Sequence, residues 1–149
     1  MLRILLILCL FKISTQKTDF EFESRVFCKN FFRIWCVEFF YLEEDLSIHD
    51  DIAHEKQQCN NGTISEVFDK SNGTLSNDGF TYEYEVRIGF RHNCSDEGFV
   101  RDFYLKPYNV LKSEPKFRKS IRATLNNEGV PKLNWESKFE FSSWKLSNG

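Results

Sequence analysis

Residues 80–90, FTYEYEVRIGF, alternate bulky apolar side chains with polar, charged or small ones along their whole length. Successive side chains of a β-strand point to opposite faces of the sheet, so this period of two predicts a half-buried strand. It is the clearest strand signal in the chain. The apolar face of the strand would consist of Phe80, Tyr82, Tyr84, Val86, Ile88 and Phe90.

Further segments of strand length lie on both sides of this stretch. Residues 20–42 are apolar at odd and even positions alike; a buried helix would give a similar run, but the many Phe, Trp and Tyr residues favour strands covered on two sides. Shorter candidates are residues 99–105, 116–125 and 133–141, and turn signals lie at residues 60–62, 71–73 and 76–79. This spacing predicts an all-β protein, an antiparallel β-sandwich of about seven or eight strands.

The composition of the chain suits one globular domain. Of its 149 residues 41% are hydrophobic and 16% aromatic, which is enough apolar surface for a single core. The formal net charge is −2. A nucleic-acid-binding protein needs a basic face for phosphates, so we expect no nucleic-acid partner.

The first residues resemble a secretory signal. Arg3 precedes an apolar run over residues 4–11, and small or polar residues follow at 14–16. The run is too short for a transmembrane anchor, which needs about 20 apolar residues. We therefore expect a signal peptide at residues 1–16, a β-sandwich at residues 17–129 and an aromatic C-terminal extension at residues 130–149, in a protein that is secreted or associated with the cell surface.

Cysteines and glycosylation motifs agree with secretion. Cleavage of the signal peptide would also remove Cys9. Four cysteines would remain, Cys28, Cys36, Cys59 and Cys94. An even number is what disulfides in an oxidising compartment require. Their spacings do not fit a zinc site. The motif for N-glycosylation occurs at Asn61, Asn72 and Asn93. We expect glycans at Asn61 and Asn72, in turn-like stretches, before Asn93, where a disulfide at Cys94 would hinder the transferase.

The polar segment 43–59 has two interpretations, a divalent-metal site or a solvated loop or short helix. It contains HDDIAHE at residues 49–55, and imidazole and carboxylate groups are suitable metal ligands. A solvated loop or short helix is the favoured interpretation, because His49 and His54 do not share a helical face. No metal, cofactor or catalytic residue is predicted: the histidines have no evident partner for general base catalysis, and no Gly-x-Ser-x-Gly motif occurs.

Five short segments of the chain follow one another in the order of the motifs of a known protein family. They are residues 26–28 (VFC), 37–45 (VEFFYLEED), 77–80 (NDGF), 86–94 (VRIGFRHNC) and 101–108 (RDFYLKPY). In this order they resemble the nematode transthyretin-like family of small secreted proteins, over about residues 20–128. The residues that match the family's most specific motifs are His92, Cys94, Arg101, Pro107 and Tyr108. The resemblance implies a transthyretin-like β-sandwich held together by disulfides.

The chain departs from the family in its cysteines. A further family cysteine has no counterpart, since Gly98 and Phe99 occupy that stretch, whereas Cys36 and Cys59 are additions. We expect bridges between Cys28 and Cys94 and between Cys36 and Cys59, although four cysteines allow three pairings.

The resemblance implies a non-catalytic binding or signalling role outside the cell, with an extracellular protein or a lipid surface as the partner. One alternative is a carrier of small hydrophobic ligands similar to transthyretin. Another is an enzyme resembling hydroxyisourate hydrolase, but the Tyr-Arg-Gly-Ser ending of those enzymes is replaced by KLSNG at residues 145–149. A weaker resemblance, over residues 31–36 and 59–62, points to the receptor-binding module of Notch ligands. We expect His92 itself to be structural.

Overall fold

The computed structural model describes residues 16–29, 34–44, 49–60, 66–77 and 81–131. These residues form strands and no helix, which confirms the all-β prediction. The strands are β1 (Lys17–Phe27), β2 (Trp35–Glu44), β3 (His49–Asn60), β4 (Glu66–Ser76), β5 (Glu83–His92), β6 (Arg101–Tyr104), β7 (Tyr108–Leu111), β8 (Lys116–Thr124) and β9 (Val130–Pro131). There are nine described strands, more than the seven or eight expected.

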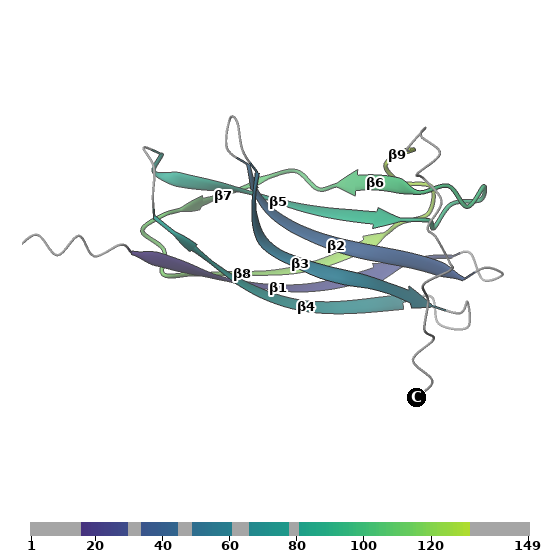
Figure 1. The fold of residues 1–149 in the computed structure, drawn as a ribbon, viewed down its shortest axis with the longest axis horizontal. Coiled ribbons are helices and arrows are strands. Elements are labelled where there is room, and N and C mark those ends of the chain that lie inside the picture. The colour runs from purple at the N-terminus through teal and green to yellow at the C-terminus, as the bar shows by residue number, and fades with distance from the viewer. Residues whose placement is uncertain (1–15, 30–33, 45–48, 61–65, 78–80, 132–149) are drawn as a thin grey trace, which may run out of the picture.

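The strands belong to two sheets (Figure 1). A three-stranded sheet has the order β4-β1-β8, and a six-stranded sheet has the order β3-β2-β5-β6-β9 with β7 also paired to β5. All described pairs are antiparallel except β1 and β8, which run parallel from Asp19↔Lys116 to Phe27↔Thr124. The prediction of a purely antiparallel sandwich was therefore wrong in one pair, because strands far apart in sequence can meet in either direction.

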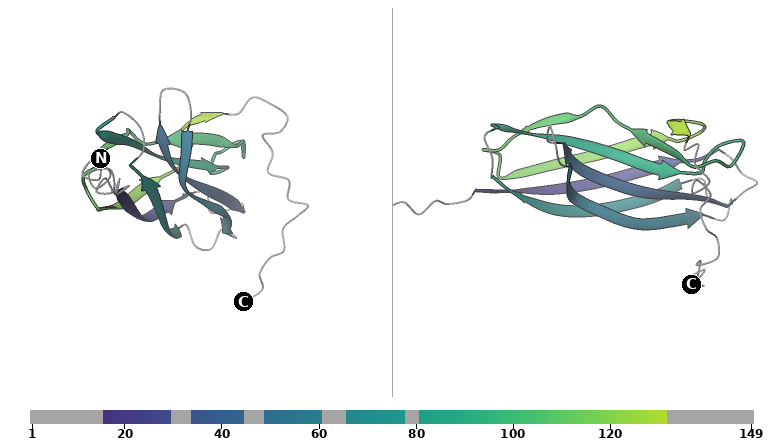
Figure 2. Two further views of the ribbon diagram at one scale, coloured as in Figure 1. Left: turned by 60° about the vertical axis from the view of Figure 1, so that its left-hand side comes forward. Right: turned by 45° about the horizontal axis from the view of Figure 1, so that its top comes forward.

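The two sheets lie face to face and share one core (Figure 2). Alternate residues of β1, β2 and β5 point into the space between them and are almost fully buried, as the period of two predicts. The ring of Phe22 in β1 stacks on the ring of Tyr41 in β2, with 4.3 Å between centroids. Other buried aromatic residues of this core are Phe20, Trp35, Phe39, Tyr84 and Phe90.

A small polar cluster lies inside this core. The Tyr41 hydroxyl donates a hydrogen bond of 2.7 Å to the Asp69 carboxylate, and the Ser71 hydroxyl donates one of 2.6 Å to the same oxygen. Ser24 of β1 bonds the Tyr41 hydroxyl at 2.9 Å. Burial raises the pKa of Tyr41, so the phenol remains a donor. The cluster joins β2 of one sheet to β1 and β4 of the other through satisfied hydrogen bonds.

Two local predictions were wrong. Residues 49–59 form most of β3 and not a loop or helix, because they pair with β2 through a ladder that contains two bulges. The turn signal at residues 71–73 lies inside β4. Gly73 serves close packing there, since a Cβ atom at this position would overlap the Ile52 carbonyl of β3.

Some predictions concern residues that the structure does not describe. The predicted signal peptide, apart from Gln16, falls in this group, as do Asn61 and the aromatic residues of the C-terminal extension. In the described part of the chain, no helix is long and apolar enough to cross a membrane.

Candidate functional site

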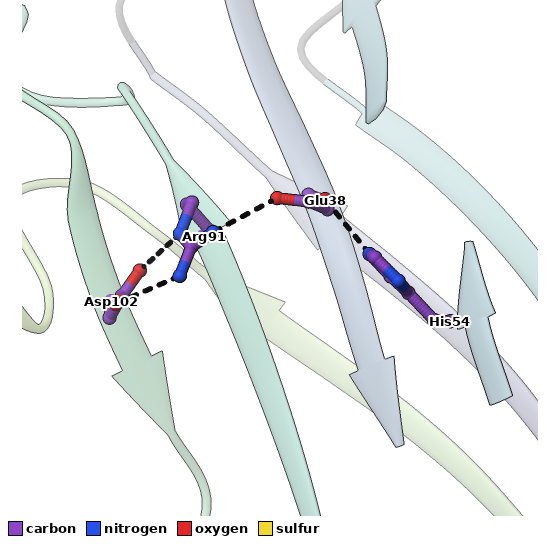
Figure 3. A network of polar contacts seen from close by, with 4 residues as sticks. All are labelled: Glu38, His54, Arg91 and Asp102. Carbon is purple, nitrogen blue, oxygen red and sulfur yellow. Dashed lines mark hydrogen bonds and ion pairs between the residues drawn. The ribbon is translucent and has the colours of Figure 1, made fainter. Parts of the chain in front are cut away.

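Four polar side chains form a row across the outer face of the six-stranded sheet (Figure 3). Arg91 of β5 pairs with Asp102 of β6 through hydrogen bonds of 2.9 and 3.4 Å, and its other side lies 3.5 Å from Glu38 of β2. Glu38 in turn bonds His54 of β3 at 2.8 Å. The ladder register explains the row, because Glu38, Arg91 and Asp102 lie directly opposite one another.

An aromatic row runs beside the polar one. Phe40 of β2, Gly89 of β5 and Tyr104 of β6 are opposite one another in the ladders. A Cβ atom at residue 89 would overlap the Tyr104 ring, so the glycine lets this ring lie flat against β5. The His54 ring stacks on Phe40 with 4.8 Å between centroids.

Two arginines cover these rings. The guanidinium of Arg91 lies 5.1 Å from the centroid of Phe40, and that of Arg87 lies 5.9 Å from the centroid of Tyr104. Such stacking attracts the cation to the ring face and restricts the side chain. Arg87 also pairs with Glu44 of β2 at 2.5 Å. We call this surface the arginine–aromatic face; it consists of Glu38, Phe40, Glu44, His54, Arg87, Arg91, Asp102 and Tyr104.

Two groups of this face, Arg91 and Tyr104, have raised pKa values. Burial lowers the pKa of Arg91, but the hydrogen bond and charge of Asp102 and the charge of Glu38 raise it above the ordinary value. Burial and the charge of Asp102 raise the pKa of Tyr104. At neutral pH Arg91 is therefore charged, and the Tyr104 phenol, which is 42% exposed, is neutral.

The described contacts of His54 are the Glu38 carboxylate and the Phe40 ring, which provide no nucleophile for it to activate. The acidic stretch around His54 was the candidate metal site, and among the described residues no group of three or more His, Cys, Asp or Glu side chains could hold an ion.

The cysteines chosen from the sequence are not members of this face, although Cys36 shares the outer side of β2 with Glu38. The structure joins Cys28 to Cys94 and Cys36 to Cys59, the same two pairs that the sequence analysis favoured. The first bridge connects the end of β1 to the segment after β5 and so links the two sheets. The second joins residues that are opposite each other in β2 and β3.

The residues that resembled the motifs of the transthyretin-like family make contacts within the fold. His92 is fully buried and its Nδ1 accepts a hydrogen bond of 3.2 Å from the Cys94 amide. Arg101 donates to the carbonyls of Asn127 and Gly129. Tyr108 opens β7 and its ring lies 4.1 Å from the Lys119 ammonium, while Pro107 is exposed between β6 and β7. None of these described contacts belongs to the arginine–aromatic face.

His92 makes stability depend on pH. Burial lowers its pKa from 6.5 to about 4, and the backbone of Glu128 offsets only part of this effect. The unfolded chain therefore binds a proton at a higher pH than the folded chain, and the contribution to stability is complete above about pH 6.5 and lost toward pH 4. We expect a loss of about 3 kcal/mol between pH 7 and pH 4 from this residue.

The measurement is urea unfolding of the native protein and of His92→Asn at both pH values. Asparagine keeps an acceptor for the Cys94 amide but does not titrate in this range. Titration of carboxylates changes the stability of both proteins alike. Between pH 7 and pH 4 the free energy of unfolding should therefore fall by about 3 kcal/mol more in the native protein than in the variant. Equal losses would show that His92 is not the acid-sensitive group.

The fold defines a class: a small two-sheet β-domain with one disulfide between its sheets and one within a sheet. Within this class, the chain belongs to the family described as "Caenorhabditis elegans protein of unknown function (DUF870)", which matches residues 23–133. No curated protein and no solved structure matches the chain.

This membership corrects the resemblance to the nematode transthyretin-like family, which was wrong. The matching pieces were short, and the most specific of them, His92-x-Cys94, has a local cause in the structure. Cys94 is bridged to Cys28, and the buried His92 ring accepts the amide hydrogen of Cys94. A His-x-Cys pair can therefore arise at the end of a strand next to a buried disulfide without common ancestry.

The arginine–aromatic face was not predicted from the sequence. One signal was available: Arg87, Gly89 and Arg91 are spaced by two in the clearest strand, so they share its polar face. Their partners Glu38, His54 and Asp102 lie in other strands. Only the strand order brings them together.

Proposed function

We propose that the protein is a secreted, non-catalytic binding module that recognises an extracellular protein through the arginine–aromatic face. The observation that carries this proposal is the stacking of Arg87 and Arg91 on two rings with carboxylates as further partners. Arginine and tyrosine are enriched among the residues that dominate binding energy. Side chains held in place before binding lose less entropy when a partner arrives.

Secretion is supported by the disulfides. Two bridges are typical of proteins from oxidising compartments. A signal peptide at residues 1–16 would bring the chain there, and β1 begins at Lys17, directly after the expected cleavage site.

The charge of the face favours a protein over a lipid surface. Its carboxylates are Glu38, Glu44 and Asp102, and they outnumber Arg87 and Arg91. Anionic membranes attract surfaces with an excess of Lys and Arg, which this face does not have. A protein partner can satisfy both signs, because its own surface carries acceptors and donors.

The interior argues against a carrier of hydrophobic ligands. The inner faces of the two sheets are in mutual contact through rings such as Phe22 and Tyr41. A ligand between the sheets would have to displace these side chains from a close-packed core. The outer surface is the more accessible place for a partner.

The test uses two photo-crosslinking probes of matched exposure. Benzoylphenylalanine replaces Tyr104 on the arginine–aromatic face or Phe68 on the outer face of the other sheet, positions that are 42% and 46% exposed. Both proteins are first treated with peptide-N-glycosidase, so that no glycan can shield residue 68, and are then incubated with the extracellular fraction of nematode tissue and with vesicles of neutral and anionic lipid. We expect saturable protein adducts from residue 104 only, and competition by the unlabelled native protein.

Once the crosslinked partner is identified by mass spectrometry, its affinity is compared for the native protein and for Arg87→Ala and Arg91→Ala. Loss of one stacked arginine is expected to weaken binding by about 30-fold, the effect typical of a residue that dominates an interface. Adducts of equal yield from residue 68, or crosslinks to lipid alone, would refute the proposal.

A further inference from the structure

The outer face of the three-stranded sheet differs from the arginine–aromatic face in containing a glycosylation motif. Asn72-Gly73-Thr74 lies in β4, where alternate side chains point outward. Ser71 on one side of Asn72 is buried in the core, whereas Asn72 is exposed. It lies opposite Glu21 of β1 in the ladder. Its amide can therefore carry a large substituent without disturbing the core.

Asn93 is in a different environment. Its side-chain Oδ1 accepts a hydrogen bond of 2.7 Å from the Cys36 backbone amide, and the Asn93 backbone amide donates one of 3.3 Å to the Cys36 carbonyl. The next residue, Cys94, is fully buried and bridged to Cys28. The side chain of Asn93 thus joins the ends of β2 and β5, and a glycan on it would have to leave from a half-buried position.

We propose that Asn72 carries an N-linked glycan and Asn93 does not, and that this glycan covers the three-stranded sheet, leaving the arginine–aromatic face for the partner. The inference rests on the secretion that belongs to the proposed function. In the transfer, the Asn72 amide nitrogen forms a bond to the anomeric carbon of an oligosaccharide carried on a polyisoprenyl diphosphate. The sugar–diphosphate bond breaks, the diphosphate leaves, and the amide nitrogen loses one proton.

The surface around Asn72 is compatible with a saccharide. The neighbouring hollow has a volume of about 490 Å³ and is lined by Glu21, Glu23, Lys70, Arg118, Lys119 and Ser120. The charged side chains that line it form ion pairs, one of 3.3 Å between Lys70 and Glu23 and one of 2.6 Å between Arg118 and Glu21. Sugar hydroxyls can bond such charged groups. The exposed ring of Phe68 lies on the same outward side of β4, where a glycan would shield it.

The experiment expresses the full chain in insect cells with its own leader and, separately, with a heterologous leader in front of Lys17. Secreted protein is treated with peptide-N-glycosidase in heavy-oxygen water, and peptides are mapped by mass spectrometry, because Asn61 also stands in a motif. We expect the isotope label at Asn72 and unmodified Asn93. Thr74→Ala and Asn72→Gln should lose the label at residue 72, whereas Thr74→Ser and Asn93→Gln should keep it.

A second readout tests which face the glycan covers. The Lys70 side chain, 60% exposed, should react more slowly with an amine reagent in glycosylated protein than in Asn72→Gln, whereas the exposed Lys106 between β6 and β7 should react equally in both. Unmodified Asn72 in secreted protein, a glycan at Asn93, or equal labelling of Lys70 would each overturn the proposal. If glycosylated protein is secreted only with the heterologous leader, the glycan site stands and native secretion fails.

Discussion

Replacing Cys28 and Cys94 together with alanine is expected to lower the free energy of unfolding by about 4 kcal/mol, the chain-entropy value for a loop of this length. The bridge spans a sequence separation of 66 residues and links the three-stranded sheet to the six-stranded sheet. Without it the unfolded chain regains the entropy that the closed loop had removed. Urea unfolding of the native and variant proteins, with slopes compared, measures the difference.

The matched control is the double replacement of Cys36 and Cys59. This bridge has a separation of 23 residues and lies within one sheet, so the same model gives about 3 kcal/mol. Both variants are measured in one concentration of a stabilising osmolyte if either is unfolded in water. A smaller loss for the Cys28 and Cys94 variant than for the control would contradict the entropic explanation.

Phe22→Ala is expected to destabilise the protein by about 3 to 5 kcal/mol, the usual cost of removing a large buried ring. Phe22 is fully buried and stacks on Tyr41 of the opposite sheet at 4.3 Å, with Phe117 at 6.3 Å in an edge contact. Truncation would leave a cavity between the sheets and remove the ring that packs beside the Tyr41–Asp69 hydrogen bond. Thermal and urea unfolding would report this loss.

Phe68→Ala is the control, because it removes the same side chain from the same sheet on its outer face. Phe68 is 46% exposed and its described ring contact is with Arg25, so we expect a loss below about 1 kcal/mol. Phe22→Leu keeps much of the volume and should fall between the two. Similar losses for Phe22→Ala and Phe68→Ala would mean that the sheets do not pack through Phe22.

The strands with a clear alternation were predicted well. Residues 80–90 overlap β5, and residues 116–125 correspond closely to β8. Residues 20–42 contain most of β1 and β2, with the inner side chains of β2 buried and the outer ones half-buried. The outer side of β2 was expected to be covered by another layer; in the described residues its neighbours on β3 and β5 cover it instead.

Polar strands were predicted poorly. Residues 49–59 are mostly polar and were expected to form a loop or short helix, and within β4 the Ser-Asn-Gly stretch at residues 71–73 was expected to be a turn. In the structure β3 is stabilised by the ladder with β2, and β4 by the ladder with β1. The packing of Gly73 against Ile52 is a contact between two strands and has no local signature.

The local pattern of side chains was enough to predict an all-β chain with disulfides among Cys28, Cys36, Cys59 and Cys94. Strand geometry imposes its period of two on each segment separately, and cysteine counting needs no coordinates. The tertiary structure was needed to find the parallel pairing of β1 with β8 and the arginine–aromatic face. Comparison with known proteins was needed to find the family. Glu38, His54, Arg91 and Asp102 come from four strands, and their contacts exist only because strand order and register bring distant residues together.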